Sequence, residues 1–210
     1  MVADEAARTT FAKNIKTVLE KNKLDGIDLD FEWAENEKEY KDYSLAILKM
    51  REVLGNKYLF SVSLHPVCYK ISKEAIEAVD FISLQCYGPS PVRFPIEKYC
   101  SDIQMVLEYG IPKEKLVAGV PFYGVTKDNS KKTEAYFNFV QNGLVTSPAQ
   151  NEVIYQGDTY VFDGQDNIRI KTRYAKEQKL KGMMSWDLAT DLPLSDSRSL
   201  LKTMTEELRE

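Results

Sequence analysis

Strand-like and helix-like segments alternate along most of this 210-residue chain, and this alternation restricts the fold more than any other feature. The predicted main strands are short apolar runs at residues 24–33, 58–65, 79–87, 115–123 and 182–188. The predicted helices show amphipathic spacing and lie at residues 4–22, 37–54, 72–78, 95–109, 167–179 and 196–208. Strands that are joined through helices favour a parallel sheet with helical cover, which places the chain in the α/β class.

Residues 126–165 interrupt this alternation. The pattern there predicts a short helix at residues 134–141 and a small hairpin around Gly157. We therefore predict a single partial domain over residues 1–210, with an insertion at residues 126–165 before the last strand.

Charge and composition exclude several classes of function. The net charge is −4, so there is no basic surface for nucleic acid or for an anionic membrane. No apolar run reaches the length of a membrane-spanning helix, and the first residues lack the apolar core of a signal peptide. The three cysteines have no metal-binding spacing and are expected to be buried. His65 is the single histidine, and without a second histidine nearby it is a poor candidate for a metal ligand.

The first predicted strand, LDGIDLDFEW, alternates strictly between apolar and acidic residues. Its apolar side chains are those of Ile27, Leu29 and Phe31, whereas its acidic side chains are those of Asp28, Asp30 and Glu32. Because successive side chains of a strand point to opposite faces, the three carboxylates share one face. Like charges at this spacing repel each other, and such an arrangement indicates a functional site.

Polar and aromatic side chains gather at the carboxyl ends of all five predicted main strands. They are Trp33, His65, Gln85, Tyr87, Phe122, Tyr123, Trp186 and Asp187. Ligands of α/β folds bind at this end of the sheet. The residues alone leave three interpretations of the carboxylates: acid-catalysed glycoside cleavage, divalent-metal binding, or a structural charge cluster. The aromatic side chains favour the first, because their rings can stack on sugar faces.

Four segments resemble the glycoside hydrolases of family 18, the chitinases and their relatives. DGIDLDFE, residues 25–32, matches the DxxDxDxE signature of that family in full. VDFISLQCYG, KLVAGVPFYG and GMMSWDLATD are similar, in order and spacing, to the family's sixth, seventh and eighth strand segments. The resemblance covers nearly the whole chain.

This resemblance implies hydrolysis of β-1,4 bonds next to N-acetylglucosamine, in chitin or chitooligosaccharides, by a retaining mechanism assisted by the substrate. The acetamido oxygen of the substrate would attack its own anomeric carbon and form an oxazolinium ion. By this resemblance Glu32 is the general acid and later the base, Asp30 orients the acetamido group, and Asp28 holds Asp30. Tyr87 would bind the acetamido oxygen, and Trp186, Gln85 and Tyr123 would bind the sugar. No cofactor and no metal are implied.

Two positions depart from the family pattern. Gln85 replaces the usual methionine and Gly88 the usual aspartate, and the Tyr-Gly ending is similar to that of some endo-β-N-acetylglucosaminidases. Hydrolysis of N-glycan cores is therefore an alternative to hydrolysis of chitin. A non-catalytic, lectin-like fragment that binds chitooligosaccharides is a second alternative.

The length is short for a (β/α)8 barrel of TIM type, which needs about 250 residues. The five main strands correspond to the family's strands four to eight, so a partial barrel is expected. Its two open sheet edges would favour self-association. The chain is interpreted as part of a longer parent protein that is secreted or at the cell surface.

Overall fold

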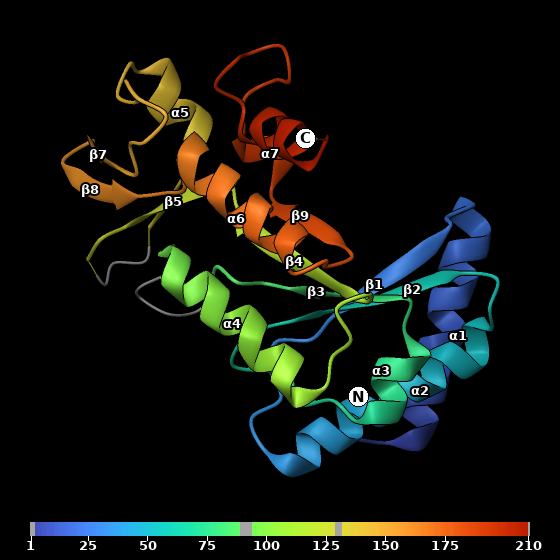
Figure 1. Cartoon of the computed structure of the whole chain (residues 1–210). Helices are drawn as coiled ribbons and strands as arrows, with labels where there is room; N and C mark the ends of the chain where they lie inside the picture. Colours follow the sequence, from blue (N-terminus) through green and yellow to red (C-terminus); the bar gives the residue numbers. More distant parts are fainter. Residues whose placement is uncertain (1–2, 89–93, 129–131, 210) are drawn as a thin grey trace. The chain divides into compact units, whose positions relative to one another are not determined.

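The computed structural model describes residues 3–88, 94–128 and 132–209. The chain forms two compact units, and each is described by itself (Figure 1). The first unit comprises Met1–Leu84 and Met105–Leu116, and the second comprises Gln85–Gln104 and Val117–Glu210. The acidic first strand lies in the first unit, and the aromatic strand ends lie mainly in the second.

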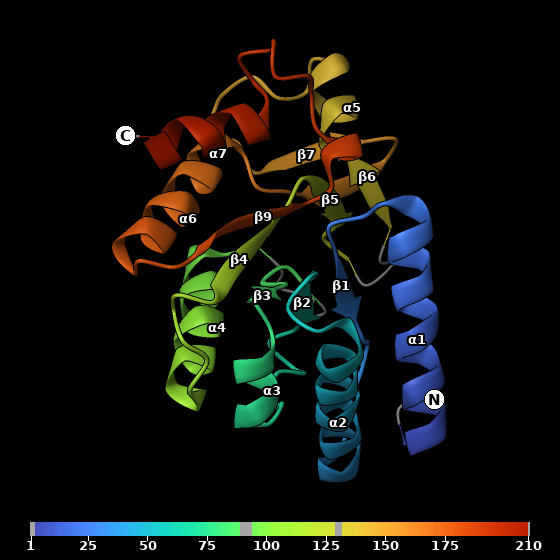
Figure 2. The same ribbon diagram turned by 90° about the vertical axis from the view of Figure 1, so that its right-hand side faces the viewer.

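The first unit alternates helices and parallel strands. Its elements are α1 (Glu5–Asn22), β1 (Gly26–Asp30), α2 (Glu37–Leu54), β2 (Leu59–Leu64), α3 (Lys73–Ala78) and β3 (Phe81–Leu84). β2 pairs in parallel with β1 on one side and with β3 on the other. α1 and α2 lie side by side (Figures 1 and 2).

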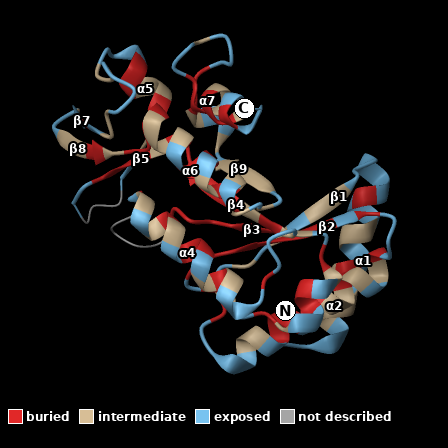
Figure 3. Cartoon of the chain, in the orientation of Figure 1, coloured by how far each residue is buried: buried red, intermediate tan, exposed pale blue. Residues whose placement is uncertain are grey.

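Helix capping explains where α1 and α2 begin. The side chain of Asp4 accepts a hydrogen bond from the Ala7 amide, and that of Asn36 accepts one from the Glu39 amide. These side chains satisfy amides that have no partner within the helix. Exposed and less exposed residues alternate around both helices (Figure 3), so each helix covers the core with one side.

The core of the first unit lies between α2 and the middle strand. Tyr43, Ile47 and Met50 of α2 are at most 1% exposed, as are Phe60 and Val62 of β2. Every residue of β2 after Leu59 is buried. A strand that is buried on both faces holds its side chains in place, which makes β2 a rigid support for its polar residues.

The second unit contains a parallel strand pair and a small antiparallel sheet. β4 (Leu116–Pro121) pairs with β9 (Gly182–Trp186) in parallel. The antiparallel sheet has the strand order β6-β5-β8-β7, with β5 (Tyr123–Thr126), β6 (Thr133–Ala135), β7 (Glu152–Tyr155) and β8 (Asp158–Val161). Its helices are α4 (Ile96–Tyr109), α5 (Tyr136–Gln141), α6 (Gln165–Glu177) and α7 (Leu200–Arg209), and the 3-10 turn is η1 (Leu188–Thr190). The last residues of α4 belong to the first unit.

The predicted elements are found within a few residues, with three corrections. The predicted strand at residues 24–33 ends at Asp30, so Glu32 follows β1 instead of ending it. Tyr123 does not end the fourth main strand. It begins β5, because it pairs with Ala135 in the antiparallel sheet. The predicted helix at residues 134–141 begins only at Tyr136, since the residues before it form β6.

The small sheet confirms the predicted hairpin around Gly157, in which β7 pairs with β8. The sheet also extends before residue 126 through β5. Residues 129–131 of the predicted insertion lie outside the described residues. The assignment of the whole chain to one partial domain remains a prediction.

The last predicted helix, residues 196–208, begins only at Leu200, where a local cap and a distant one meet. The Ser199 hydroxyl accepts a hydrogen bond from the Lys202 amide at 3.1 Å, and Asp191 is the distant cap. The carboxylate of Asp191 accepts hydrogen bonds from the amides of Leu200 and Leu201, both at 2.8–2.9 Å, and from the Ser199 hydroxyl. Asp191 thus satisfies the first amides of α7 from about ten residues upstream. A capping motif that is read over three or four residues cannot reveal such a contact.

The cysteines differ in exposure, which leads to a prediction about their reactivity. Cys68 and Cys86 are buried, whereas Cys100 is partly exposed, and all three are free thiols. Burial raises the pKa of Cys86 to about 12 and raises the pKa of the other two thiols as well. We expect Ellman's reagent to modify Cys100 first, and the other two only on unfolding, because the thiolate is the reactive form. Cys100→Ser should remove the first phase. A fast phase that persists in this variant would contradict the prediction.

Across the described parts of the chain, no helix combines the length and apolarity that crossing a lipid bilayer requires.

Candidate active site

The carboxylates of β1 face a row of polar side chains on β2. The parallel register pairs Asp28 with Ser61 and Asp30 with Ser63. Asp28 and Asp30 are exposed, whereas the apolar residues between and beside them are partly buried. The period-two interpretation of this strand is confirmed, because its acidic side chains lie on one face and its apolar side chains on the other.

Two serine hydroxyls hold Asp28. The Ser61 hydroxyl donates to Oδ1 of Asp28 at 2.5 Å, and the Ser63 hydroxyl donates to Oδ2 at 2.7 Å. Each oxygen of this carboxylate therefore has its own donor, and hydrogen bonds to an ionised acceptor are the stronger ones. Asp28 is therefore fixed at the inner end of the carboxylate row. Its predicted role of holding Asp30 stays a prediction.

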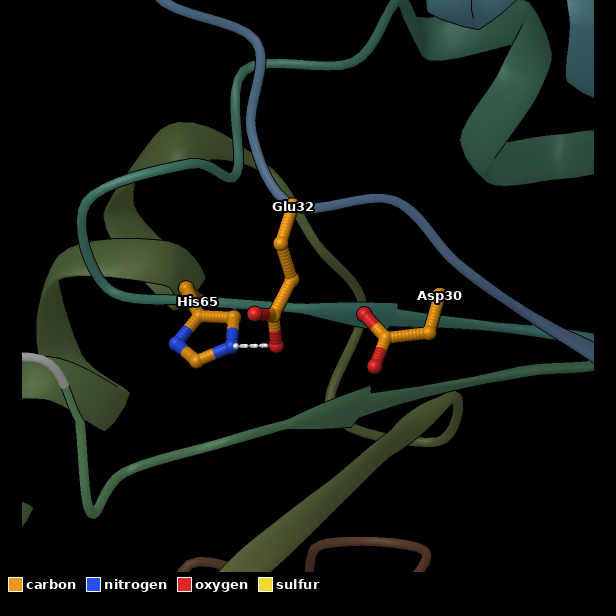
Figure 4. Close-up of side chains that lie close together, drawn as sticks. All are labelled: Asp30, Glu32 and His65. Carbon is orange, nitrogen blue, oxygen red and sulfur yellow. Dashed lines mark hydrogen bonds and ion pairs between the residues drawn. The ribbon is translucent and has the colours of Figure 1, made fainter.

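The outer end of the row contains the pair of Glu32 and His65. Oε1 of Glu32 lies 3.0 Å from Nε2 of His65, and Asp30 lies beside them (Figure 4). The imidazole is 5% exposed and meets the Trp33 ring edge-on, with 4.0 Å between ring centroids. The Glu32 side chain is 44% exposed, so one carboxyl group contacts both a buried base and solvent.

Contacts behind the row position the chain after β1. The Tyr43 hydroxyl donates to the Leu29 carbonyl at 3.3 Å, and the rings of Phe31 and Tyr43 are 5.0 Å apart. The Ala34 amide donates to the Cys68 sulfur at 3.2 Å. Burial raises the pKa of the Tyr43 hydroxyl above its ordinary value, so this group remains a neutral donor. The segment that carries Glu32 is therefore held at both ends.

Sequence reasoning missed three residues of this site. The sequence pattern assigns no role to Ser61 and Ser63, and it places His65 at a strand end without pairing it with Glu32. A signal was nevertheless present in YLFSVSLH, where the two serines and the histidine occupy alternate positions. Period two places all three on one face of β2, which is the face that meets the carboxylates.

In the second unit, Tyr123 and Trp186 line one pocket of about 300 Å³. The other residues that line it are Thr133, Glu134, Ala135, Asp187 and Thr190. Trp186 is 56% exposed, which is high for the largest apolar side chain. An exposed indole beside acidic and hydroxyl groups is suited to bind a sugar ring.

Tyr87 and Gln85 are buried in the second unit. The Tyr87 hydroxyl lies 3.9 Å from the Met184 sulfur, and its ring meets that of Tyr123 edge-on at 6.3 Å between centroids. Gln85 is 8% exposed. Their predicted contacts with substrate stay predictions. The structure thus brings the carboxylates together in the first unit and Tyr87, Tyr123 and Trp186 together in the second.

The model of the family described as glycosyl hydrolases family 18 matches residues 1–191. The chain belongs to this family. It is 24% identical over 255 aligned positions to a protein named probable chitinase 2 from Drosophila melanogaster, covering 91% of this chain and 52% of that protein. The chain spans 38 to 65% of the length of the first three curated relatives it matches.

Solved structures of two chitinases and a chitinase-like agglutinin have a similar fold. A chitinase, ChiB, from Flavobacterium johnsoniae gives a TM-score of 0.78 at 26% identity over 94% of this chain and 64% of its own. A class V chitinase from Nicotiana tobaccum in complex with NAG4 gives 0.81 at 17% identity over 99% and 75%. A chitinase-like agglutinin from Robinia pseudoacacia gives 0.81 at 19% identity over 98% and 74%.

These structures confirm the predicted fold class, the (β/α)8 barrel of TIM type. The described part of the chain has five main strands, paired in parallel as β1-β2-β3 and as β4-β9, and it does not form a closed barrel. This glycosyl hydrolase chain therefore has part of the family's barrel.

Proposed function

We propose that this chain carries the acid–base centre of a chitinase, which hydrolyses β-1,4 bonds next to N-acetylglucosamine in chitin or chitooligosaccharides. The observation that carries the proposal is the carboxylate row, in which Asp28 is held by two serines and Glu32 lies exposed at the outer end. Membership of the family and the chitinases among its relatives support the same chemistry. The parent protein would act outside the cell.

In the proposed reaction Glu32 donates a proton to the leaving glycosidic oxygen. The acetamido oxygen of the bound sugar attacks the anomeric carbon, the bond to the leaving oxygen breaks, and an oxazolinium ion forms. Glu32, now a carboxylate, takes a proton from the water that opens this ion and restores the sugar with retained configuration. His65 contacts the same carboxyl group and holds it in position during both steps.

Asp30 is proposed to orient the acetamido group and to stabilise the positive charge of the oxazolinium ion. It ends β1 between Asp28, on the same strand face, and Glu32, which follows the strand, and the serine contacts of Asp28 support the row from within. A fixed anion next to developing positive charge lowers the barrier without reorganisation during the reaction. In the second unit, Trp186 and Tyr123 line one pocket and would bind the sugar. Gln85 would also bind the sugar, and Tyr87 would bind the acetamido oxygen.

Two other functions compete with this one. The chain spans only part of its relatives, and an agglutinin shares its fold, which favours a binding protein without turnover as the second candidate. Cleavage of N-glycan cores is the alternative substrate, indicated by Gln85 and Gly88.

The test is a calorimetric titration of the chain with chitotetraose, with chromatography of the products from the same samples. We expect binding and cleavage together. Binding without product would favour the lectin-like function, and cleavage of an N-glycan core alone would favour the alternative substrate. Neither binding nor product with either sugar would overturn the proposal for this chain.

Trp186→Ala tests the sugar-binding surface. Loss of the exposed indole should weaken chitotetraose binding roughly tenfold, since an aromatic contact contributes about 0.5–1.5 kcal/mol beyond its buried area. Ile154→Ala is the matched control, because Ile154 is also exposed, at 71%, but lies outside the pocket on β7. Equal affinities of the two variants would contradict the role of Trp186.

A further inference from the structure

Three groups that can bind a metal ion meet where β1 and β2 end. A carboxylate oxygen of Asp30, a carboxylate oxygen of Glu32 and a ring nitrogen of His65 all lie within 4.8 Å of one another (Figure 4). Asp30 is the last residue of β1, Glu32 follows two residues later, and His65 directly follows β2, which pairs with β1. One imidazole together with carboxylates is a ligand set that suits Zn²⁺ and related transition-metal ions.

The imidazole distinguishes this group from an ordinary acidic cluster. The His65 side chain is 6% exposed, and its Nε2 atom is directed at the Glu32 carboxylate, 3.0 Å away. The Trp33 ring packs against it and limits its rotation. A buried, oriented nitrogen donor loses little conformational entropy when it binds a cation, because its rotamer is already selected.

Distances are compatible with a single ion after a small side-chain movement. Ligand atoms about 2.0–2.1 Å from a tetrahedral Zn²⁺ lie roughly 3.3 Å from each other. The Glu32–His65 separation of 3.0 Å is already close to this value. A carboxylate oxygen of Asp30 already lies within 4.8 Å of the ligand atoms of this pair. The exposure of both acids also leaves a path for the ion to enter.

The negative charge of the carboxylates favours the binding of a cation at this position. Carboxylate oxygens of Asp30 and Glu32 lie within 4.8 Å of each other, and their mutual repulsion is relieved when a divalent cation lies between them. The ligands would be three, which leaves one tetrahedral position for water.

We propose that Asp30, Glu32 and His65 bind one divalent transition-metal ion of the Zn²⁺ type. The bound ion would be coordinated by the Glu32 carboxylate, which the proposed hydrolysis uses as its proton donor. The metal therefore inhibits hydrolysis instead of assisting it. The site goes beyond the proposed function, and binding can be measured without any sugar. The two proposals can therefore fail independently. A chain that binds zinc but does not hydrolyse chitooligosaccharides would support the metal site and refute the proposed hydrolysis.

The experiment is a ZnCl₂ titration of the chain without a polyhistidine tag. His65 is the single histidine, so its imidazole resonances in an NMR spectrum report on one position. We expect these resonances to shift, with a calorimetric stoichiometry of one ion per chain. MgCl₂ should cause no shift, since Mg²⁺ prefers oxygen ligands and water.

Substitutions of single residues identify the side chains that bind the ion. His65→Ala and Asp30→Asn should each weaken zinc binding by at least about tenfold, since loss of even an outer-shell partner costs about 10–100-fold. Glu35→Gln, which removes an exposed acid outside the cluster, should bind as the unaltered chain does. Circular dichroism verifies that each variant folds. If His65→Ala does not fold, the zinc affinity of Asp30→Asn, a change at an exposed position, tests the proposal. Unshifted His65 resonances, or undiminished binding by a folded variant, would overturn the proposal.

Discussion

Glu32→Gln is expected to lower the rate of chitooligosaccharide hydrolysis by a factor of about 10²–10⁴, the usual contribution of a general acid or base. Glutamine keeps the size of the side chain and an oxygen that can accept a hydrogen bond from His65, but it has no acidic proton to donate. The Glu32 carboxyl group is 44% exposed and ends the carboxylate row, where a glycosidic oxygen can reach it. The rate of product release from chitotetraose under saturating substrate is the measurement.

The matched control for this variant is Glu35→Gln. It makes the same chemical change three residues further along, at an exposed position outside the row, and should leave the rate unchanged. Calorimetry should show that Glu32→Gln still binds chitotetraose, because sugar affinity comes mainly from other contacts. Full hydrolytic activity of a folded Glu32→Gln variant would remove Glu32 from its assigned role.

Lys171→Met is expected to lower the free energy of unfolding by about 3–5 kcal/mol, the cost of removing one partner of a buried ion pair. Nζ of Lys171 lies 2.5 Å from Oδ2 of Asp163, and the two side chains are 1% and 0% exposed. The ammonium group also lies 5.5 Å from the centroid of the Tyr99 ring. Methionine fills similar space but leaves the Asp163 carboxylate buried without its cation, although Asn167 still donates a hydrogen bond to it.

Urea unfolding measures this loss, and Arg169→Met provides the control. Arg169 lies on the same helix and pairs with Asp166 at 2.7 Å, but both of those side chains are well exposed, at 39% and 45%. Exposed pairs contribute about 0–1 kcal/mol, so Arg169→Met should change the stability little. Equal losses in the two variants would contradict the argument from burial.

A double variant tests the cause of the destabilisation. Adding Asp163→Asn to Lys171→Met replaces the uncompensated carboxylate with a neutral amide, so part of the lost stability should return. If instead the loss came from packing alone, the second substitution would add to the first. Double-variant comparisons separate these cases because the two side chains are in direct contact.

The order of elements could be predicted because each depends on a local period. Alternation in residues 26–30 and helical spacing in residues 37–54 are properties of short segments, and both elements formed where the pattern indicated. Element ends were less predictable. α7 begins at Leu200 because Asp191 caps it from a distance, and Tyr123 joined β5 because it pairs with Ala135. Both ends depend on contacts between segments that are separate in sequence.

The sequence by itself determined the family and the composition of the carboxylate row. The DxxDxDxE motif begins one residue before β1 and ends two residues after it. Its period of two places Asp28 and Asp30 on a common face of the strand, and Glu32 follows just beyond the strand end. What that face meets was decided only by tertiary structure. The pairing of β1 with β2 places Ser61 and Ser63 against Asp28 and brings His65 to Glu32, across more than 30 residues of chain. The alternation of residues along a strand specifies which side chains share a face. The register and the neighbouring strand depend on how two strands pack, and here the packing of β1 against β2 brings His65 to the acidic side chains.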